Sequence, residues 1–209
     1  MIDVKLGTAG DDDSISDSFK LQGFNAKGDV LFTGAGDDTV NVELFSGFDN
    51  KIFTGTGADT IFAGTRDIIT GGSDADEIWA EAGDDNRLSG GLGADTFHIG
   101  TSGNRVLGGK GDDIINVLEG AGTNYLNGGA GIDRFWLVSD PGDQSSAKKQ
   151  FVMDFKVGED LVGLRGVAFS DLSFTQVGGD TLLKWNQVEL GHFNNVIAAS
   201  LNNQTNFSF

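Results

Sequence analysis

The chain has 209 residues and a formal net charge of −17, with 33 glycines, one proline and no cysteine. So much glycine with so little proline is unlike collagen or low-complexity disorder, and 16 phenylalanines give the chain enough to bury. The acidity disfavours nucleic acid and anionic membranes as partners. The lack of cysteine excludes disulfides and thiolate metal sites, and no apolar stretch is long enough to predict a membrane span.

A nonapeptide repeat runs through the first two thirds of the chain. Six copies fit the pattern G-G-x-G-x-D-x-U-x, in which U is apolar, and a looser copy spans residues 7–15. Two copies begin with threonine, and Asp74 replaces the third glycine of another. The U residues recur every 17 to 21 residues, about the length of two nonapeptides. They are Val40, Ile61, Ile78, Phe97, Ile115 and Phe135.

A second, degenerate half-repeat lies between successive copies and supplies a second apolar column. Each half-repeat has the pattern of a turn followed by a short strand with alternating apolar and polar residues. Two strands per coil, stacked on those of the next coil, predict an all-β fold. We expect a right-handed parallel β-roll, a solenoid with an apolar core between two sheets. The second column is predicted to be Leu31, Ile52, Ile69, Leu88, Leu107 and Leu126.

An aspartate lies two residues before each U residue, so stacking places these carboxylates one coil apart. Like charges at that spacing repel by about 3 kcal/mol at an effective dielectric near 20. A calcium ion between adjacent turns removes the repulsion, because calcium accepts carboxylates and the backbone carbonyls that glycine turns can direct at it. We therefore predict about five calcium ions on this edge. The predicted ligands are Asp13, Gly36, Asp38, Gly57, Asp59, Asp74, Asp76, Gly93, Asp95, Gly111, Asp113, Gly131 and Asp133.

The opposite edge carries different residues in the corresponding column. Asparagine is neutral and can hydrogen-bond along a stack, and Arg105 puts a cation where an ion would otherwise lie. Amide hydrogen bonds are therefore predicted to hold this edge, with one further ion considered near Asp84 or Asp85. The column is predicted to be Asp29, Asn50, Asp67, Asn86, Arg105 and Asn124.

These repeats resemble those of the RTX (repeats-in-toxin, haemolysin-type) calcium-binding family over roughly residues 7–137. The segment FVMDFKVGEDLVGL at 151–164 and the final NFSF are similar to the C-terminal region of such bacterial proteins, cyanobacterial ones included. The resemblance implies export by a type I (ABC-transporter) system through an uncleaved C-terminal signal, with folding outside the cell. Residues 1–10 have no signal-peptide pattern, which fits this route.

Two domains are predicted, a calcium-binding β-roll at residues 1–139 and a β-rich C-terminal cap with the secretion signal region at 140–209. The second part lacks the glycine nonapeptides and is more apolar, as a cover for the last coil must be. Asp154, Glu159 and Asp160 are considered as ligands of a further ion, against simpler roles in turns or at the surface.

No catalytic site is predicted. The two histidines, His98 and His192, lie in no H-E-x-x-H motif, and the chain has no G-x-S-x-G nucleophile elbow. The well-placed carboxylates are already explained by the calcium column. The predicted function is that of a non-enzymatic, secreted protein that folds when it binds calcium.

An alternative function is considered beside this one. The outward position after each U residue forms a row with three aromatic side chains, Phe62, Trp79 and Trp136, which could stack on sugar rings. The chain would then be an accessory module of a polysaccharide-modifying exoenzyme, like the R-modules of alginate epimerases, with a polysaccharide or cell surface as its partner. The simpler interpretation is that the tail or a neighbouring molecule covers the row.

Overall fold

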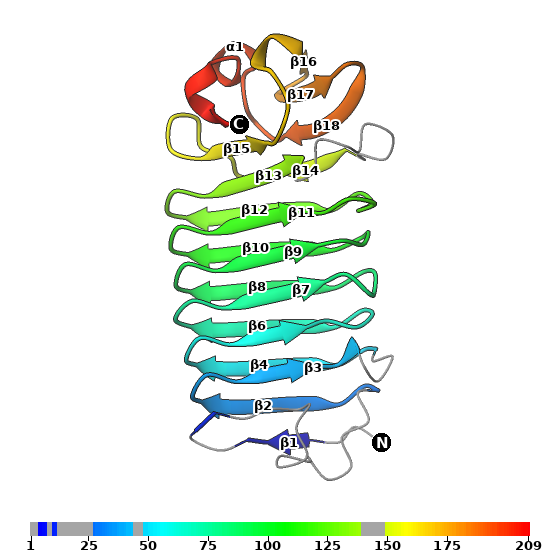
Figure 1. Cartoon of the computed structure of the whole chain (residues 1–209), viewed down its shortest axis with the longest axis vertical. Helices are drawn as coiled ribbons and strands as arrows, with labels where there is room; N and C mark the ends of the chain where they lie inside the picture. The colour runs from blue at the N-terminus through cyan, green and yellow to red at the C-terminus, as the bar shows by residue number, and fades with distance from the viewer. Residues whose placement is uncertain (1–3, 8–9, 12–26, 44–47, 139–148) are drawn as a thin grey trace.

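The computed structural model is a parallel β-roll in which two sheets lie face to face and a cap covers the C-terminal end (Figure 1). The structure describes residues 4–7, 10–11, 27–43, 48–138 and 149–209. Each coil adds one strand to each sheet, and the coils follow one another along the long axis of the molecule (Figure 1). The predicted all-β solenoid is confirmed. Asp13 and the predicted domain boundary after residue 139 lie outside the described residues.

The larger sheet, here called sheet A, has 11 strands in the described part of the chain, and only its last two pairings, within the cap, are antiparallel. In pairing order its strands are β1 (Val4–Leu6), β2 (Val30–Ala35), β4 (Lys51–Thr56), β6 (Ile68–Ser73), β8 (Arg87–Leu92), β10 (Arg105–Lys110), β12 (Tyr125–Ala130), β14 (Gln150–Val152), β18 (Val188–Phe193), β17 (Asp180–Trp185) and β16 (Leu172–Val177).

The smaller sheet, sheet B, has eight strands over the same described ranges, and all of its pairings are parallel. From the N-terminal coil onward they are β3 (Thr39–Asn41), β5 (Thr60–Phe62), β7 (Glu77–Ala80), β9 (Thr96–Ile99), β11 (Ile114–Val117), β13 (Arg134–Val138), β15 (Leu161–Leu164) and β19 (Phe207–Ser208).

The core lies between the two sheets and is made by the inward residues of each short strand. All six predicted U residues, from Val40 to Phe135, are fully buried with 0% exposure. They stack in register along sheet B, as in the pairing of Ile61 with Ile78. Since a single coil leaves its inward residues open above and below, this burial is completed by stacking on the neighbouring coils. The first predicted apolar column is confirmed.

The second apolar column is confirmed except at one coil. Val106, not Leu107, pairs with Leu88 and Leu126 and is 3% exposed, while Leu107 points outward and is 46% exposed. The prediction of Leu107 followed a constant spacing of 19 residues, but the loops before and after β10 differ in length. Because side chains alternate along a strand, a shift of one residue moves a side chain from the core to the surface.

The cap begins by continuing the solenoid. β14 pairs with β12 and β15 pairs with β13, so the chain completes a further coil before it leaves the repeat pattern. β16, β17 and β18 then form an antiparallel meander on sheet A. Phe193 is fully buried and packs edge-on against Phe155, with ring centroids 5.2 Å apart. The short helices of the cap are η2 (Phe169–Asp171), α1 (Ala198–Leu201) and η3 (Gln204–Asn206).

Candidate metal centre

The aspartates that precede the U residues form one continuous column, here called the Asp edge. From Asp59 onward, the Oδ1 atom of each accepts a hydrogen bond from the backbone N–H of the aspartate in the preceding coil, with N–O distances of 2.8 to 3.1 Å. Each carboxylate is thus held in place by its neighbour. The column is Asp38, Asp59, Asp76, Asp95, Asp113, Asp133 and, in the cap, Asp160.

The second carboxylate oxygen, Oδ2, distinguishes this edge. In the four repeats that begin with two glycines, Oδ2 is buried and accepts no hydrogen bond. It lies over the first glycine of its repeat, where any Cβ atom would collide with it. A buried charged oxygen without a partner is costly, so it calls for a proton or a cation. The glycine–aspartate pairs are Gly71 with Asp76, Gly90 with Asp95, Gly108 with Asp113, and Gly128 with Asp133.

The fourth position of each repeat, where the third glycine of the pattern stands, turns the backbone sharply. Asp74, which replaces glycine in one copy, adopts a φ of 78°. The carbonyl oxygen of this position points toward the next coil, because a Cβ atom on Gly93 would collide with the carbonyl of Asp74. Each turn therefore directs a backbone oxygen along the stack. The glycines in this position have φ values between 117° and 134° and are Gly36, Gly57, Gly93, Gly111 and Gly131.

Burial raises the pKa of the carboxyl groups on the Asp edge from Asp59 to Asp160. The pKa of Asp76 is raised to about 8, that of Asp113 to about 7 and that of Asp133 to about 6. For Asp76 the neighbouring carboxylates of Asp59 and Asp95 raise it further, while the backbone N–H of Asp59 lowers it. In the absence of a cation, Asp76 therefore holds a proton near neutral pH and Asp113 is partly protonated, whereas Asp133 is mostly ionised.

These features fit a hard divalent cation. In the part of the chain that the structure describes, no three aspartate, glutamate or histidine side chains converge on one point. An ion on the Asp edge would therefore combine carboxylates of adjacent coils with backbone carbonyls and water. Calcium accepts such mixed and flexible oxygen sets, whereas magnesium demands a near-octahedral shell and gives up its waters reluctantly.

The opposite column, here called the amide edge, repeats the same hydrogen bond, mostly with neutral amide side chains. A side-chain oxygen accepts from the backbone N–H of the preceding coil, at 2.8 to 3.1 Å. The side-chain nitrogens are also used, since Nδ2 of Asn124 donates to the carbonyls of Thr101 and Gly122 and to Oε1 of Gln150. The column is Asp29, Asn50, Asp67, Asn86, Asn104, Asn124 and Gln150.

The placement of Arg105 in this column is wrong, because Asn104 occupies the position. Arg105 lies one residue further along and is exposed on sheet A. The acid of this edge, Asp67, differs from the acids of the Asp edge. Its Oδ1 accepts from the backbone and side chain of Asn50, and its Oδ2 accepts from the N–H of Gly64 at 2.7 Å. Both oxygens are therefore satisfied by the protein itself.

The further candidate ligands also have protein partners. Oδ1 of Asp84 accepts from the N–H and the hydroxyl of Ser102, at 2.8 and 2.9 Å. The two oxygens of Asp154 accept from the N–H groups of Gly128 and Gly129. Asp160 lies two residues before the buried Val162, and this spacing is the signal that could have placed it in the Asp column.

The nonapeptide pattern is that of a known repeat. The family model described as "RTX calcium-binding nonapeptide repeat (4 copies)" matches residues 25–44, 46–65, 64–97, 84–101 and 98–135, together more than half of the chain. The chain belongs to the RTX calcium-binding repeat family. The Asp edge of this RTX chain is thus formed by the residues that define the family pattern.

Two further comparisons accompany the family match. The solution structure of the AlgE6R3 subunit from the Azotobacter vinelandii mannuronan C5-epimerase is similar over 73% of this chain and 80% of that one, with 20% identity and a TM-score of 0.38. No curated protein matches the sequence. Within the described ranges, none of the RTX chain's helices combines the length and the apolar character required to cross a membrane.

The aromatic row on sheet B is packed against itself. Trp79 lies between Phe62 and His98, with ring centroids 6.1 and 3.6 Å away and interplanar angles of 19° and 8°. Trp136 fills the space above Gly163, and the guanidinium of Arg165 from the cap lies 4.9 Å from its ring centroid. The ring faces of Trp79 therefore meet neighbouring rings rather than solvent.

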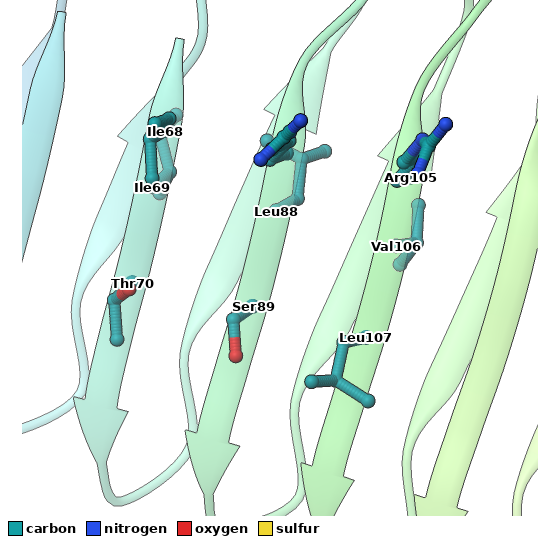
Figure 2. Close-up of a pocket in the computed structure, with 9 residues that line it drawn as sticks. Ile68, Ile69, Thr70, Leu88, Ser89, Arg105, Val106 and Leu107 are labelled. Carbon is teal, nitrogen blue, oxygen red and sulfur yellow. The ribbon is translucent and has the colours of Figure 1, made fainter.

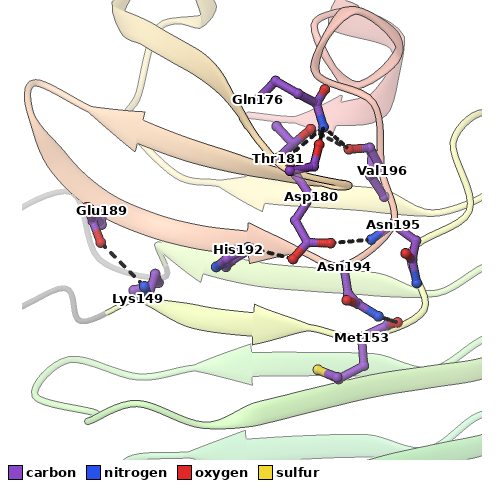
Figure 3. A network of polar contacts seen from close by, with 11 residues as sticks. Lys149, Met153, Gln176, Asp180, Thr181, Glu189, His192, Asn194, Asn195 and Val196 are labelled. Atoms are coloured by element: carbon purple, nitrogen blue, oxygen red, sulfur yellow. Dashed lines mark hydrogen bonds and ion pairs between the residues drawn. The ribbon is translucent and has the colours of Figure 1, made fainter.

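Both histidines pair with carboxylates. Nε2 of His98 lies 3.1 Å from Oε1 of Glu77, and Nε2 of His192 lies 3.0 Å from Oδ2 of Asp180. Asp180 also accepts from the N–H of Asn195, so the pair ties β17 and β18 to the turn that follows (Figure 3). In the described part of the RTX chain, no serine or threonine hydroxyl is hydrogen-bonded to either imidazole.

Proposed function

We propose that this RTX chain binds several calcium ions between adjacent turns of the Asp edge and that their binding drives its folding. The observation that carries the proposal is the column of buried Oδ2 atoms without hydrogen-bond partners. Calcium supplies the positive charge that this column lacks. Asp38 to Asp133 provide the carboxylates, together with the carbonyls of Gly36, Gly57, Asp74, Gly93, Gly111 and Gly131.

The proposal places about five ions between the six turns of the repeats. Asp160 continues the column into the cap, but its two oxygens accept from the backbone N–H groups of Asp133 and Lys156, so no further site is placed there. The amide edge takes no ion in this proposal, because its side-chain oxygens and nitrogens are paired with one another and with the backbone.

Calcium-dependent folding also gives the proposal its cellular setting. A metal that binds only the folded state stabilises that state, so the chain stays unfolded where calcium is scarce and folds where calcium is abundant. We infer a secreted, non-enzymatic protein that leaves the cytoplasm unfolded through a type I system and folds outside. The family resemblance of residues 151–164 supports this route.

The first experiment is a calcium titration followed by far-UV circular dichroism. In chelator near neutral pH we expect little β structure, and calcium should produce a cooperative gain of it. Magnesium at the same concentration should produce much less, because it cannot use the mixed oxygen set as calcium does. A chain that is fully folded in chelator at this pH, or that responds equally to both ions, would overturn the proposal.

The accessory carbohydrate-binding function gains no support from the geometry of the aromatic row. Sugar rings stack on open ring faces, and the faces of Trp79 are covered by Phe62 and His98. Trp136 is in contact with Arg165 of the cap. We therefore prefer the calcium-dependent folding module.

A further inference from the structure

The outer face of sheet A has a composition unlike the rest of this acidic chain. Strands β2, β4, β6, β8, β10 and β12 point alternate residues outward, and none of these residues is aspartate or glutamate. Two rows carry side chains and a third row is glycine. The first row is Val30, Lys51, Ile68, Arg87, Arg105 and Tyr125, and the second is Phe32, Phe53, Thr70, Ser89, Leu107 and Asn127.

The cations of this face have no carboxylate beside them. Lys51, Arg87 and Arg105 share one row, and within the described residues none of the three forms an ion pair. Arg105 instead places its guanidinium 5.7 Å from the ring centroid of Tyr125. In contrast, the exposed Arg66 on a turn pairs with Asp49 at 2.8 Å. The basic charge of the outer face is therefore available to an external anion.

Large apolar side chains lie among these cations. Phe32 is 42% exposed, Ile68 36%, Leu107 46% and Tyr125 42%. Figure 2 shows Ile68, Arg105 and Leu107 around a shallow hollow of about 320 Å³, which Arg87 and the side chains of Thr70 and Ser89 also line. A soluble protein seldom collects so much exposed apolar surface on one flat face without a partner.

We propose that the outer face of sheet A docks on an anionic lipid bilayer. Its arginines would contact headgroup phosphates, while Phe32, Ile68, Leu107 and Tyr125 would enter the interface between headgroups and acyl chains. The aliphatic side chains favour lipid over a soluble polyanion, because a hydrated polysaccharide or nucleic acid offers aliphatic groups far less apolar surface than acyl chains do. The glycine row leaves one flank of the face without side chains, so the sheet can approach a flat surface closely.

The overall charge of −17 does not prevent this contact. Exposed charges are screened beyond about 8 Å at physiological ionic strength, so the acids of the edges and the cap act weakly at this face. Each calcium ion on the Asp edge would offset two further negative charges. The docking face exists only when the coils are stacked, and to this extent it rests on the proposed calcium-dependent fold.

The test is co-sedimentation of the calcium-loaded full chain with vesicles. We expect binding to vesicles of equal parts phosphatidylcholine and phosphatidylglycerol, none to phosphatidylcholine alone, and weakening by salt. The double variant Arg87→Gln, Arg105→Gln should bind roughly thirtyfold more weakly, from the usual weight of two cations at a membrane surface. The double variant Arg134→Gln, Arg165→Gln removes the same charge from the side of sheet B, where Arg134 begins β13 and Arg165 follows β15, and should bind like the parent.

A second variant, Leu107→Ser, tests the apolar contribution. Ser89 already occupies the equivalent position one coil away, so the fold should accept it, and vesicle binding should weaken several-fold. Equal binding by the two double variants would mean that calcium merely bridges acidic protein to lipid, and would overturn the proposal. So would tighter binding of dextran sulfate than of vesicles with no effect of Leu107→Ser.

Circular dichroism of each variant separates this proposal from the calcium proposal. If the parent and the variants all gain β structure with calcium but none of them, the parent included, binds vesicles, the docking face is refuted and the calcium edge stays intact. A parent that is folded and binds vesicles in chelator would refute calcium-dependent folding and leave the docking face intact.

Discussion

Asp95 and Asn104 stand at equivalent positions on the two edges of the roll and make the same hydrogen bond. A side-chain oxygen of each accepts from the backbone N–H of the preceding coil, at 2.9 and 3.0 Å. They differ in their second atom. Nδ2 of Asn104 donates to Oδ1 of Asn124 and to the hydroxyl of Thr101, whereas Oδ2 of Asp95 is buried and accepts nothing. The second side-chain atom, Nδ2 of asparagine or Oδ2 of aspartate, thus decides whether the hydrogen bonds of the edge are complete or a cation is needed.

Exchanging that atom gives the sharpest residue-level prediction. In the variant Asp95→Asn, an amide replaces a carboxylate that is proposed to bind the ions on both sides of its coil, so the calcium midpoint should rise about tenfold or more. In chelator the same variant should be at least as structured as the parent, because a buried carboxylate no longer has to be protonated. Both effects are measured by circular dichroism during a calcium titration.

The matched control is Glu119→Gln, which removes the same charge from an exposed residue between β11 and β12. It should leave the calcium midpoint nearly unchanged. If the two variants behave alike, calcium responds to net charge rather than to ligands on the Asp edge.

Where the strands of sheet A meet the Asp edge, a glycine leaves the room that the aspartate carboxylate occupies. In β8 the first glycine of the repeat, Gly90, lies under Oδ2 of Asp95. Two natural copies have threonine at this position, and the interaction of Thr54 with Asp59 lowers the pKa of that carboxyl. Alanine would add the Cβ atom without the hydroxyl.

The variant Gly90→Ala should therefore displace the carboxylate of Asp95. We expect a loss of about 1–3 kcal/mol in the stability of the calcium-loaded chain, measured by thermal unfolding. Gly179→Ala is the control, because a Cβ there has only Oδ1 of Asn195 nearby, at 3.6 Å. A stability equal to that of the parent for Gly90→Ala would show that the carboxylate does not need its present position.

The same elements explain how far the sequence could be interpreted. The strand type, both sheets and the Asp column follow from the spacing of aspartate and U residues, which repeats in every coil. The assignments of Arg105 and Leu107 failed because the half-repeat before β10 has no glycine motif to fix its register. The sequence did carry a signal for Asn104, because Asn-Arg-Val at 104–106 parallels Asn-Arg-Leu at 86–88, with the asparagine two residues before the buried apolar residue.

The cap was predictable as a β-rich cover but not in its details. β14 and β15 continue both sheets without any glycine nonapeptide, so only their stacking on β12 and β13 identifies them as a further coil. Likewise, the stacking of Trp79 on His98 depends on side-chain rotamers, which the spacing of the row leaves undetermined.

For the whole molecule, the raised pKa values predict how the calcium-free fold responds to pH. In the unfolded chain these aspartates titrate near 3.9, whereas in the fold the pKa is about 8 for Asp76, about 7 for Asp113 and about 6 for Asp133. Between the unfolded pKa near 3.9 and the highest folded pKa, about 8 for Asp76, the folded state holds more protons than the unfolded state. The stability of the calcium-free fold therefore falls as the pH rises. The calcium-free fold is therefore most stable near the acidic end of this range.

We expect the calcium-free chain to have clearly more β structure at about pH 5 than at about pH 8.5 by circular dichroism. Saturating calcium should abolish or reverse this order, because the ions replace the protons, and calcium binding near pH 7 should release protons into a weakly buffered solution. Identical spectra of the calcium-free chain at both pH values would contradict the assignment of these buried carboxyl groups.

The different chemistry of the two edges has a mechanical consequence for the whole rod. The spacing of the coils along the amide edge is set by hydrogen bonds alone, whereas along the Asp edge bound ions would act on the spacing in addition to the hydrogen bonds between coils. A rod that can lengthen along only one side bends instead of stretching. We therefore expect the calcium concentration to set the curvature of the roll, and with it the shape that the outer face of sheet A offers to a flat surface.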